Sequence, residues 1–381
     1  MVPPFVFGKI AVKEEFTNRE KDTAFLIQNF EALNTVILIA PRRWGKSSLV
    51  RHATKKLIEK NKNFRVVTLD LFNIKSESEF YSRLAVEIIK AHTSKLEDII
   101  KKSGKFFKNI MPKLNFSPMP DADFSLSLDW DEAQKHKSEI LDMAEQMSIQ
   151  SGVKTLICID QFQNIGHFED PLAFQKELRA HWQQHQNVAY CLYGSRENMM
   201  REVFSDKKMP FYKFGQVINL NKIKSEKWIP FITQRFSDTK KSISEENANY
   251  IVHLADNHPY YVQQLSQLAW MMTTDHCQIE NIESGLDNLL NQSHPFYLRE
   301  MENISRTQSN FLQLLINDET EYTTQRIIKK YSLRSTSNVV KVRKALEEKD
   351  VIRFENKKVL FVDPMLKLWL KRVYFSRNYK R

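Results

Sequence analysis

Short runs of apolar residues alternate with longer amphipathic stretches through the first half of the chain. The apolar runs predict buried strands at residues 35–39, 64–70, 154–160, 187–193 and 217–220. The stretches between them repeat apolar residues at helical spacing, and they predict helices within residues 13–33 and at 46–60, 76–92, 131–150 and 171–185. Strands that alternate with helices favour an α/β fold with a parallel sheet.

The first of these strands leads into a pattern that is typical of a phosphate-binding loop. Gly45-Lys46-Ser47 follows the strand directly and opens a helix, so backbone N–H groups and the helix dipole would face an anion there. Lys46 would reach the β- and γ-phosphates, and the Ser47 hydroxyl would be a ligand of Mg²⁺. The residues expected around the nucleotide are Pro41, Arg42, Arg43, Trp44, Gly45, Lys46, Ser47 and Ser48.

One position departs from that pattern, since Ala40 stands where the first glycine usually is. Alanine avoids positive φ angles, but the first glycine is the less demanding of the two. We therefore keep the interpretation of a phosphate-binding loop. The competing interpretation is an ordinary strand, turn and helix that contain Gly-Lys-Ser by chance.

A buried strand ends in Asp160, the position at which phosphate-loop NTPases hold the Mg²⁺ shell. The next residue in such enzymes is usually a glutamate that activates water, and here it is Gln161. An amide can orient a water molecule, but it cannot accept a proton at neutral pH. Two explanations stay open: a naturally slow hydrolase that works as a nucleotide-bound switch, or a Glu→Gln change that traps ATP. The competing role for Asp160 is to cap the turn after its strand.

Arg196 follows the next buried strand, in the segment Gly194-Ser195-Arg196. A fixed cation at a strand end can stabilise charge on a terminal phosphate, so Arg196 is our candidate sensor of the γ-phosphate. The competing interpretation is a surface arginine after a turn.

Residues 101–130 interrupt the alternation of helices and strands. Pro112, Pro118 and Pro120 lie close together, which argues against a continuous helix. Residues 124–130 alternate apolar and polar side chains as a strand does. We expect a surface hairpin or projecting insertion, which could be a partner-binding element or a mobile loop.

The second half of the chain has a different pattern. Residues 225 to about 292 are helical and predict a small lid-like bundle, in which His258-Pro259 separates two helices. Further helices are predicted at 308–316, 323–331 and 335–349, followed by strand-like runs at 351–354 and 358–362. Three helices and a short hairpin indicate a winged helix-turn-helix.

The last of these helices and the charge distribution together suggest a polyanionic partner. Lys+Arg and Asp+Glu number 40 each in residues 1–320, whereas residues 321–381 hold 17 and 6, so the entire net charge of +11 lies in this segment. Such a concentrated positive field favours DNA or another polyanion. The alternative is that the module only packs against the ATPase core. The candidate DNA-contacting residues are Ser337, Asn338, Lys341 and Lys344.

Composition narrows the class of protein further. The chain has 381 residues, 42% of them hydrophobic, which predicts two or three domains with full cores. Its three cysteines are far apart, so a disulfide framework or a zinc site is not expected and a reducing cytoplasm fits. We expect neither a signal peptide at Met1-Val2-Pro3-Pro4 nor a membrane span.

At this point the chain resembles a known group: the archaeal and bacterial ATPases of the signal-transduction (STAND) class of AAA+-like P-loop NTPases with a C-terminal winged helix. Pro-Arg-Arg-x-Gly-Lys-Ser and Asp-x-Phe-Gln together are fairly specific for it. The matching stretches are residues 16–20, 40–49, 159–165, 194–196, 210–212, 258–261 and 363–369.

This resemblance implies an ATPase core that binds ATP and Mg²⁺, a helical lid and a winged helix. It also implies that the segment 16–20, with Asn18 and Arg19, and the region of Pro259 flank the adenine. The family usually has Glu at the place of Gln161 and Gly at the place of Asn257, so the resemblance leaves turnover and details of the lid open.

We therefore predict an AAA+-like core at residues 1–222 with the insertion at 101–130, a lid at 223–300 and a winged helix at 301–381. The expected function is an ATP·Mg²⁺-dependent switch, with Lys46, Asp160, Gln161 and Arg196 around the reacting phosphate. The alternative is a nucleotide-dependent DNA-binding protein that resembles AAA+ origin initiators. A third interpretation is an interaction scaffold with a structural nucleotide. A homo-oligomer and a partner protein are both compatible with the sequence.

Overall fold

The structure is a computed structural model that describes residues 2–11, 15–92, 114–119, 122–355 and 358–378. The chain forms two compact units, and each is described by itself. The core unit comprises Arg19–Asn221, and the helical unit comprises Met1–Asn18 together with Lys222–Arg381. Within the described residues, no helix combines the length and the apolar character that crossing a membrane requires.

The core unit is built on a parallel five-stranded sheet, as the alternating pattern predicts. Its strands are β1 (Val36–Ile39), β2 (Phe64–Asp70), β5 (Lys154–Asp160), β6 (Val188–Gly194) and β7 (Gln216–Asn219). They lie in the order β2-β5-β6-β1-β7, and neighbouring strands run parallel. Because the strands are parallel, all their carboxyl ends meet at one edge of the sheet. β6 separates the strand before the phosphate loop from the strand that ends in Asp160.

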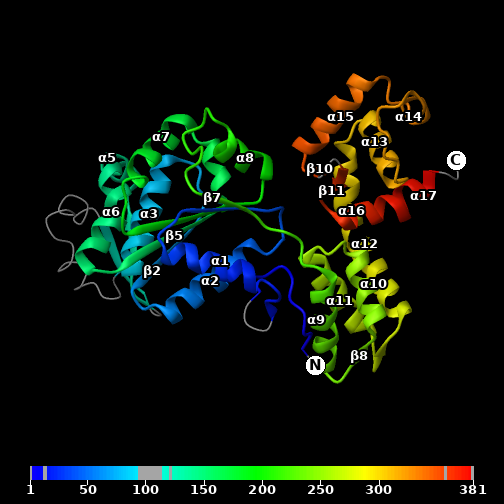
Figure 1. Cartoon of the computed structure of the whole chain (residues 1–381), viewed down its shortest axis with the longest axis horizontal. Helices are drawn as coiled ribbons and strands as arrows, with labels where there is room; N and C mark the ends of the chain where they lie inside the picture. The colour runs from blue at the N-terminus through cyan, green and yellow to red at the C-terminus, as the bar shows by residue number, and fades with distance from the viewer. Residues whose placement is uncertain (1, 12–14, 93–113, 120–121, 356–357, 379–381) are drawn as a thin grey trace. The chain divides into compact units, whose positions relative to one another are not determined.

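Helices cover both faces of this sheet (Figure 1). On one side lie α1 (Glu20–Glu31) and α2 (Lys46–Lys60), and on the other α3 (Glu77–His92), α6 (Lys137–Ser151) and α7 (Pro171–Trp182). Alternate strand residues such as Ile39, Ile159 and Leu192 belong to the apolar core on the α3 side. The side chains between them, such as Asp160, therefore face the α1–α2 side.

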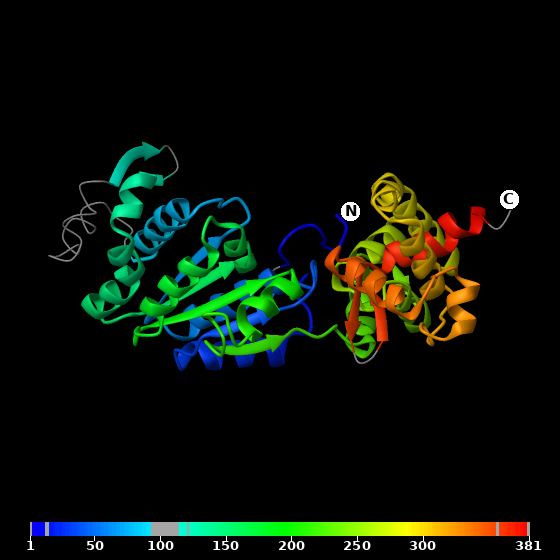
Figure 2. The same ribbon diagram turned by 90° about the horizontal axis from the view of Figure 1, so that it is seen from above.

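Two predicted segments differ in detail. The helix predicted at 131–150 is broken at His136, whose φ of −110° lies outside the helical range. α5 (Trp130–Lys135), which Asp129 caps, ends there, and α6 begins after it. Within the predicted insertion, β3 (Leu114–Met119) and β4 (Ala122–Leu128) form an antiparallel hairpin. Figure 2 shows this hairpin beside α3 and away from the sheet. The remainder of the insertion, residues 101–113 and 120–121, lies outside the described residues.

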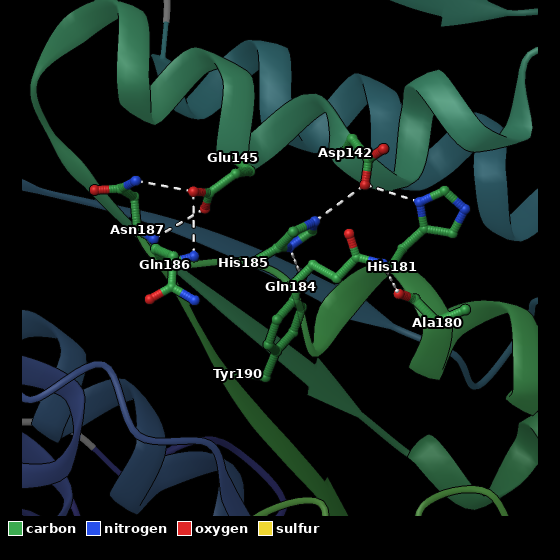
Figure 3. A network of polar contacts seen from close by, with 9 residues as sticks. All are labelled: Asp142, Glu145, Ala180, His181, Gln184, His185, Gln186, Asn187 and Tyr190. Carbon is green, nitrogen blue, oxygen red and sulfur yellow. Dashed lines mark hydrogen bonds and ion pairs between the residues drawn. The ribbon is translucent and has the colours of Figure 1, made fainter.

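A polar network fixes the opposite edge of the sheet, where β6 begins (Figure 3). Glu145 of α6 accepts hydrogen bonds from the backbone N–H groups of Gln186 and Asn187 at 3.1 and 2.9 Å. The Asp142 carboxylate bonds His181 Nδ1 at 2.8 Å and His185 Nε2 at 3.1 Å. These contacts fasten the connection between α7 and β6 to α6, far from the strand ends that carry the candidate site.

This network predicts a stability change with pH. Burial lowers the pKa of His185 below its ordinary value of 6.5, although Asp142 partly opposes the shift. The unfolded chain therefore binds a proton at His185 below about pH 6.5 that the folded protein does not bind, so the free energy of unfolding falls as pH decreases. Between pH 6.5 and 5, we expect a steeper loss in urea denaturation for the wild type than for His185→Gln, by up to about 1.4 kcal/mol per pH unit. His253→Gln, an exposed control, is expected to keep the wild-type slope, and equal slopes for all three proteins would contradict the assignment.

The helical unit begins with the lid helices, α9 (Ser225–Ser237), α10 (Glu245–Leu254) and α11 (Pro259–Met272), with a small parallel pair formed by β8 (Ser242–Ile243) and β9 (His276–Cys277). The N-terminal segment, which we expected in the core domain, contacts this unit instead. Phe5 is buried in its apolar core, and Val6 N–H donates to Gln263 Oε1 of α11 at 3.1 Å.

The winged helix consists of α13 (Arg306–Ile316), α14 (Gln325–Lys330), α15 (Thr336–Glu348), β10 (Ile352–Glu355) and β11 (Lys358–Phe361), and it is followed by α16 (Pro364–Trp369) and α17 (Phe375–Asn378). The 24-residue helix α12 (Ile279–Glu302) connects it to the lid. Tyr261 of α11 and Tyr297 of α12 both donate to Asp363 Oδ2, at 2.7 and 3.1 Å. Lid and winged helix thus share one continuous core and form one compact unit rather than two separate bodies.

Candidate nucleotide-binding site

The predicted site residues of the core unit come together where the parallel strands end. β1 leads into the phosphate loop, β6 leads into Ser195 and Arg196, and β5 ends at Asp160. β6 pairs with both β1 and β5, so these three ends are neighbours. Ligands of open α/β sheets bind at this carboxyl edge.

The phosphate loop folds as its glycine and helix start require. Gly45 has φ +87° and is the residue before α2, a conformation that a side chain would strain. Ala40 is fully buried and is not among the residues with positive φ, so alanine is tolerated where glycine is usual. The Lys46 ammonium donates to the carbonyls of Ala40 and Pro41, at 2.8 Å each. It therefore spans the loop at the start of α2, where a phosphate would meet both a cation and backbone N–H groups.

Ser47 and Asp160 form the oxygen pair that a magnesium ion would need. Ser47 Oγ donates to Asp160 Oδ2 at 2.6 Å, although the two residues are far apart in sequence. Burial raises the pKa of Asp160, and the charge of Asp70 adds to that shift, while bonds from Ser47 and from Gln161 N–H oppose it. A partly buried hydroxyl and carboxylate side by side at a phosphate loop fit Mg²⁺, which takes hard oxygen ligands and would neutralise the charge of the carboxylate.

Gln161 is held in an uncommon backbone conformation, with φ +55°. Its side-chain oxygen accepts two hydrogen bonds, from Gln163 Nε2 at 2.7 Å and from Ser195 Oγ at 3.2 Å. A carbonyl oxygen has two lone pairs, so both are used and the amide can offer a water molecule only N–H donors. The side chain therefore connects the ends of β5 and β6 and lacks the chemistry of a base.

Gly194 makes room for this arrangement. A Cβ atom at Gly194 would lie 1.9 Å from Gln163 Oε1 and 2.8 Å from Met200 Sδ. Only a residue without a side chain lets Gln163 approach the end of β6 and reach Gln161.

Arg19 binds the backbone of the phosphate loop through its guanidinium. Its guanidinium is buried and donates to Asp22 Oδ2 at 3.1 Å, to the Asn221 carbonyl at 2.7 Å and to the Trp44 carbonyl at 3.4 Å. One side chain thus ties the start of α1, the loop and the end of β7 together. The bonds described for the Arg19 guanidinium are thus directed at protein groups, one of them the carbonyl of the loop residue Trp44.

The other predicted residues lie as follows. Pro41 and Trp44 are buried, whereas Arg42 and Arg43 are exposed on the loop. Arg196 is half-buried at the end of β6, and its Nη1 contacts Met199 Sδ at 3.6 Å, a weak acceptor. Asn18, with φ +49°, and Pro259, the first residue of α11, belong to the helical unit.

On the winged helix, three of the four predicted DNA-contacting residues are exposed along α15: Ser337, Lys341 and Lys344. Asn338 is half-buried, because its Nδ2 donates to the Leu333 carbonyl at 3.0 Å and so helps to begin the helix. Val340 lies on the same exposed face at helical spacing and was not among the predicted residues.

Gln163, Ser195 and Asp70 at the core site were also not predicted from the sequence. The first two carry no signal in a single sequence, since their role depends on contacts with Gln161. Asp70 had a signal, because it ends an apolar strand just as Asp160 does. Asp70 and Asp160 are paired in register on β2 and β5.

Comparisons with known proteins place this geometry in a fold. Residues 295–372 match the family model described as "Probable winged helix domain". A Walker-type ATPase of Pyrococcus abyssi is similar over 97% of this chain and 99% of its own, at 14% identity and a TM-score of 0.68. The ORC2 protein of Aeropyrum pernix, in its ADPNP–ADP complexes, is similar over 98% and 99%, at 13% identity and a TM-score of 0.60. No curated protein matches the sequence.

These similarities extend over nearly the whole chain, while the identities are too low to transfer an activity. They establish the arrangement of the elements, including the parallel sheet, the helices after it and the terminal winged helix. The chain therefore has the fold of an AAA+-like P-loop ATPase core followed by a helical lid and a C-terminal winged helix.

Proposed function

We propose that this protein is an ATP·Mg²⁺-binding molecular switch of the STAND type with slow turnover. The observation that carries the proposal is the meeting of Lys46, Ser47 and Asp160 at the carboxyl edge of the sheet, with Ser47 Oγ 2.6 Å from Asp160 Oδ2. An ammonium group, a helix N-terminus and a partly buried carboxylate in one place favour a nucleoside triphosphate with its metal ion. The neighbour from Aeropyrum pernix, which has the same fold, was solved with ADPNP and ADP.

In this proposal each residue of the site has a separate task. Lys46 leaves the carbonyls of Ala40 and Pro41 and binds the β- and γ-phosphates. Ser47 and Asp160 would hold Mg²⁺, and the ion would supply positive charge against the phosphate oxygens. Arg196, at the neighbouring strand end, senses the γ-phosphate. Gln161 fixes the end of β6 through Ser195, so it couples the metal-binding strand to the sensor strand.

The signal passes to the helical unit as a whole in this proposal. Lid and winged helix share one core and the Asp363 contacts, so they respond to nucleotide together. A ligand shifts such an equilibrium only by its differential affinity for the two states. The partner of the winged helix is therefore expected to bind the ATP and ADP forms with different affinities.

Replacing Gln161 by glutamate tests this function directly through the rate of ATP turnover. Gln161→Glu keeps an acceptor for Gln163 and Ser195 and adds a second carboxylate oxygen that can accept a proton. We expect ATP turnover to rise at least about tenfold, because a positioned general base contributes about 10²–10⁴-fold. Steady-state phosphate release measures it, with Gln161→Asn as an amide control that should stay slow. ATP binding without any rise in turnover would contradict this assignment of Gln161.

A second candidate function is nucleotide-dependent DNA binding. The observation that favours it is the absence of Asp and Glu from residues 322–346, which contain seven Lys and Arg. Ser337, Lys341 and Lys344 project from α15 in this segment, where a winged helix meets a major groove.

Salt dependence tests this second candidate. Each phosphate contact contributes about −0.9 to the slope of log affinity against log salt concentration. Lys341→Ala with Lys344→Ala should therefore weaken duplex binding and reduce the slope by about 2. Lys55→Ala with Lys56→Ala removes the same charge from the exposed face of α2 and serves as the control. Equal slopes for both double variants would exclude α15 as the DNA-binding surface.

A further inference from the structure

We infer that Asp70, at the end of β2, supplies the carboxylate that orients and deprotonates the attacking water in ATP hydrolysis. The inference rests on the proposed nucleotide site and adds a catalytic residue to it. It starts from a chemical gap: the residue after Asp160 is an amide whose only acceptor atom is used twice. A carboxylate that accepts the proton at this site would therefore have to come from another strand end.

Register places Asp70 beside the proposed metal ligand. Asp70 and Asp160 are the last residues of the parallel strands β2 and β5, and they are direct partners in the pairing. Partners in register have side chains on the same face of a sheet. Ser47 of α2 bonds Asp160 on that face, so Asp70 lies on the face where the phosphate loop ends.

Hydrogen bonds fix the backbone on which Asp70 sits. The Leu71 N–H donates to the Asp160 carbonyl at 3.1 Å, which continues the pairing of β2 with β5 by one residue. Asn164 Nδ2, three residues after Gln161, donates to the Leu71 carbonyl at 3.0 Å. The strand end that carries Asp70 is therefore attached to both sides of Gln161, and its position follows that of the site.

The carboxylate of Asp70 has a fixed orientation and is open to solvent. One oxygen, Oδ1, accepts the Phe72 N–H at 2.9 Å, which sets the orientation of the group. Asp70 is exposed, in contrast to the more deeply placed Asp160, so a proton that it takes can pass to solvent. Among the carboxylates whose side chains are described at this edge, Asp70 is the one in register with Asp160.

The step balances without a further reagent. The oxygen of water forms a bond to the γ-phosphorus, and the bond from that phosphorus to the β–γ bridging oxygen breaks. The bridging oxygen keeps the electron pair and leaves as ADP. One proton of the water moves to the Asp70 carboxylate and then to solvent, while inorganic phosphate is the second product.

The test is Asp70→Asn in the full-length protein. Asparagine keeps an acceptor for the Phe72 N–H but cannot take a proton. We expect kcat to fall by about 10²-fold or more, with the Kd for ATP unchanged within about twofold. The control Asp206→Asn has the same local geometry, since Asp206 Oδ1 accepts the Lys208 N–H at 2.9 Å, and it should keep wild-type turnover.

Two further measurements separate a catalytic role from a structural one. Affinity for ADP with aluminium fluoride and Mg²⁺, measured by calorimetry, should drop in Asp70→Asn, because this complex resembles the transferring phosphoryl group. In the double variant Asp70→Asn with Gln161→Glu, turnover should return to that of Gln161→Glu. Each of four results would overturn the inference. In Asp70→Asn these are turnover within about twofold of wild type, or a loss of ATP affinity as large as the loss of kcat. The other two are no rescue in the double variant, and ATP binding without turnover in the wild type. Failure of the wild type to bind ATP at all would instead refute the proposed function.

Discussion

Replacing Lys46 by alanine is expected to weaken ATP binding by about 10- to 100-fold. A hydrogen bond to a charged group contributes about 1.5–3 kcal/mol, and each 1.4 kcal/mol changes a dissociation constant tenfold. Lys46 is 5% exposed and bonds two loop carbonyls, so its ammonium is already held at the loop before a phosphate arrives. When ATP binds, the ammonium exchanges these carbonyls for phosphate oxygens at the same loop, so the side chain loses little further freedom.

Calorimetric titration with ATP and Mg²⁺ measures this change. The matched control is Lys56→Ala, which removes the same charge from an exposed position of the same helix α2. Its affinity should remain within about twofold of wild type, because exposed charges are screened by salt. Equal affinities for Lys46→Ala and wild type would show that the nucleotide, if any, binds elsewhere.

Replacing Arg19 by leucine has the second large expected effect, this time on stability and nucleotide binding together. Leucine fills the buried space but leaves two carbonyls, of Trp44 and Asn221, and the Asp22 carboxylate without their donor. Breaking such contacts costs about 1–3 kcal/mol for each unsatisfied group. Asp22 is partly exposed and regains water, so we expect a decrease of about 2–4 kcal/mol in the free energy of unfolding.

Urea denaturation followed by ATP titration tests Arg19→Leu. ATP affinity should fall as well, since the loop carbonyl of Trp44 loses the hydrogen bond from Arg19. Arg19→Lys keeps the charge but not the planar fork that reaches three acceptors, so it should give an intermediate result. A stability equal to wild type in both variants would mean that the loop is held by its own turn alone.

The sequence predicted most of the core because its signals are local. The strand before Gly45-Lys46-Ser47 and the strand before Asp160 are apolar runs with clear ends, and both occur close to the expected bounds. The winged helix was also predictable, since three helices and two strands follow each other closely and the family model matches this part. Each of these helices and strands gives its signal within about fifteen neighbouring residues.

The parts that were missed depend on contacts between distant residues. Phe5 gives no periodic signal in its short N-terminal segment, yet it is buried among the lid helices. The pairing of Asp70 with Asp160 depends on the strand order, which a single sequence does not contain. The helical pattern predicts an exposed side chain for Asn338. In the structure this side chain is half-buried, because its Nδ2 donates to the Leu333 carbonyl just before α15.

The site shows the same division. Lys46, Ser47 and Asp160 were predicted from motifs, and the structure brings the last two into a hydrogen bond across 113 positions of sequence. The role of Gln161 as a link to Ser195 was not predictable, because it requires the left-handed backbone at φ +55° and the missing side chain of Gly194. Chemistry could be predicted from residue types, whereas the partners of each group could not.

The most direct test of the central claim is a crystal structure with a non-hydrolysable ATP analogue and Mg²⁺. We predict triphosphate density inside the loop 40–47, with the Lys46 ammonium on the β- and γ-phosphates and the metal ion between Ser47 Oγ and the Asp160 carboxylate. Density for the nucleotide at any other place, with Lys46 still bonded to the carbonyls of Ala40 and Pro41, would contradict the account.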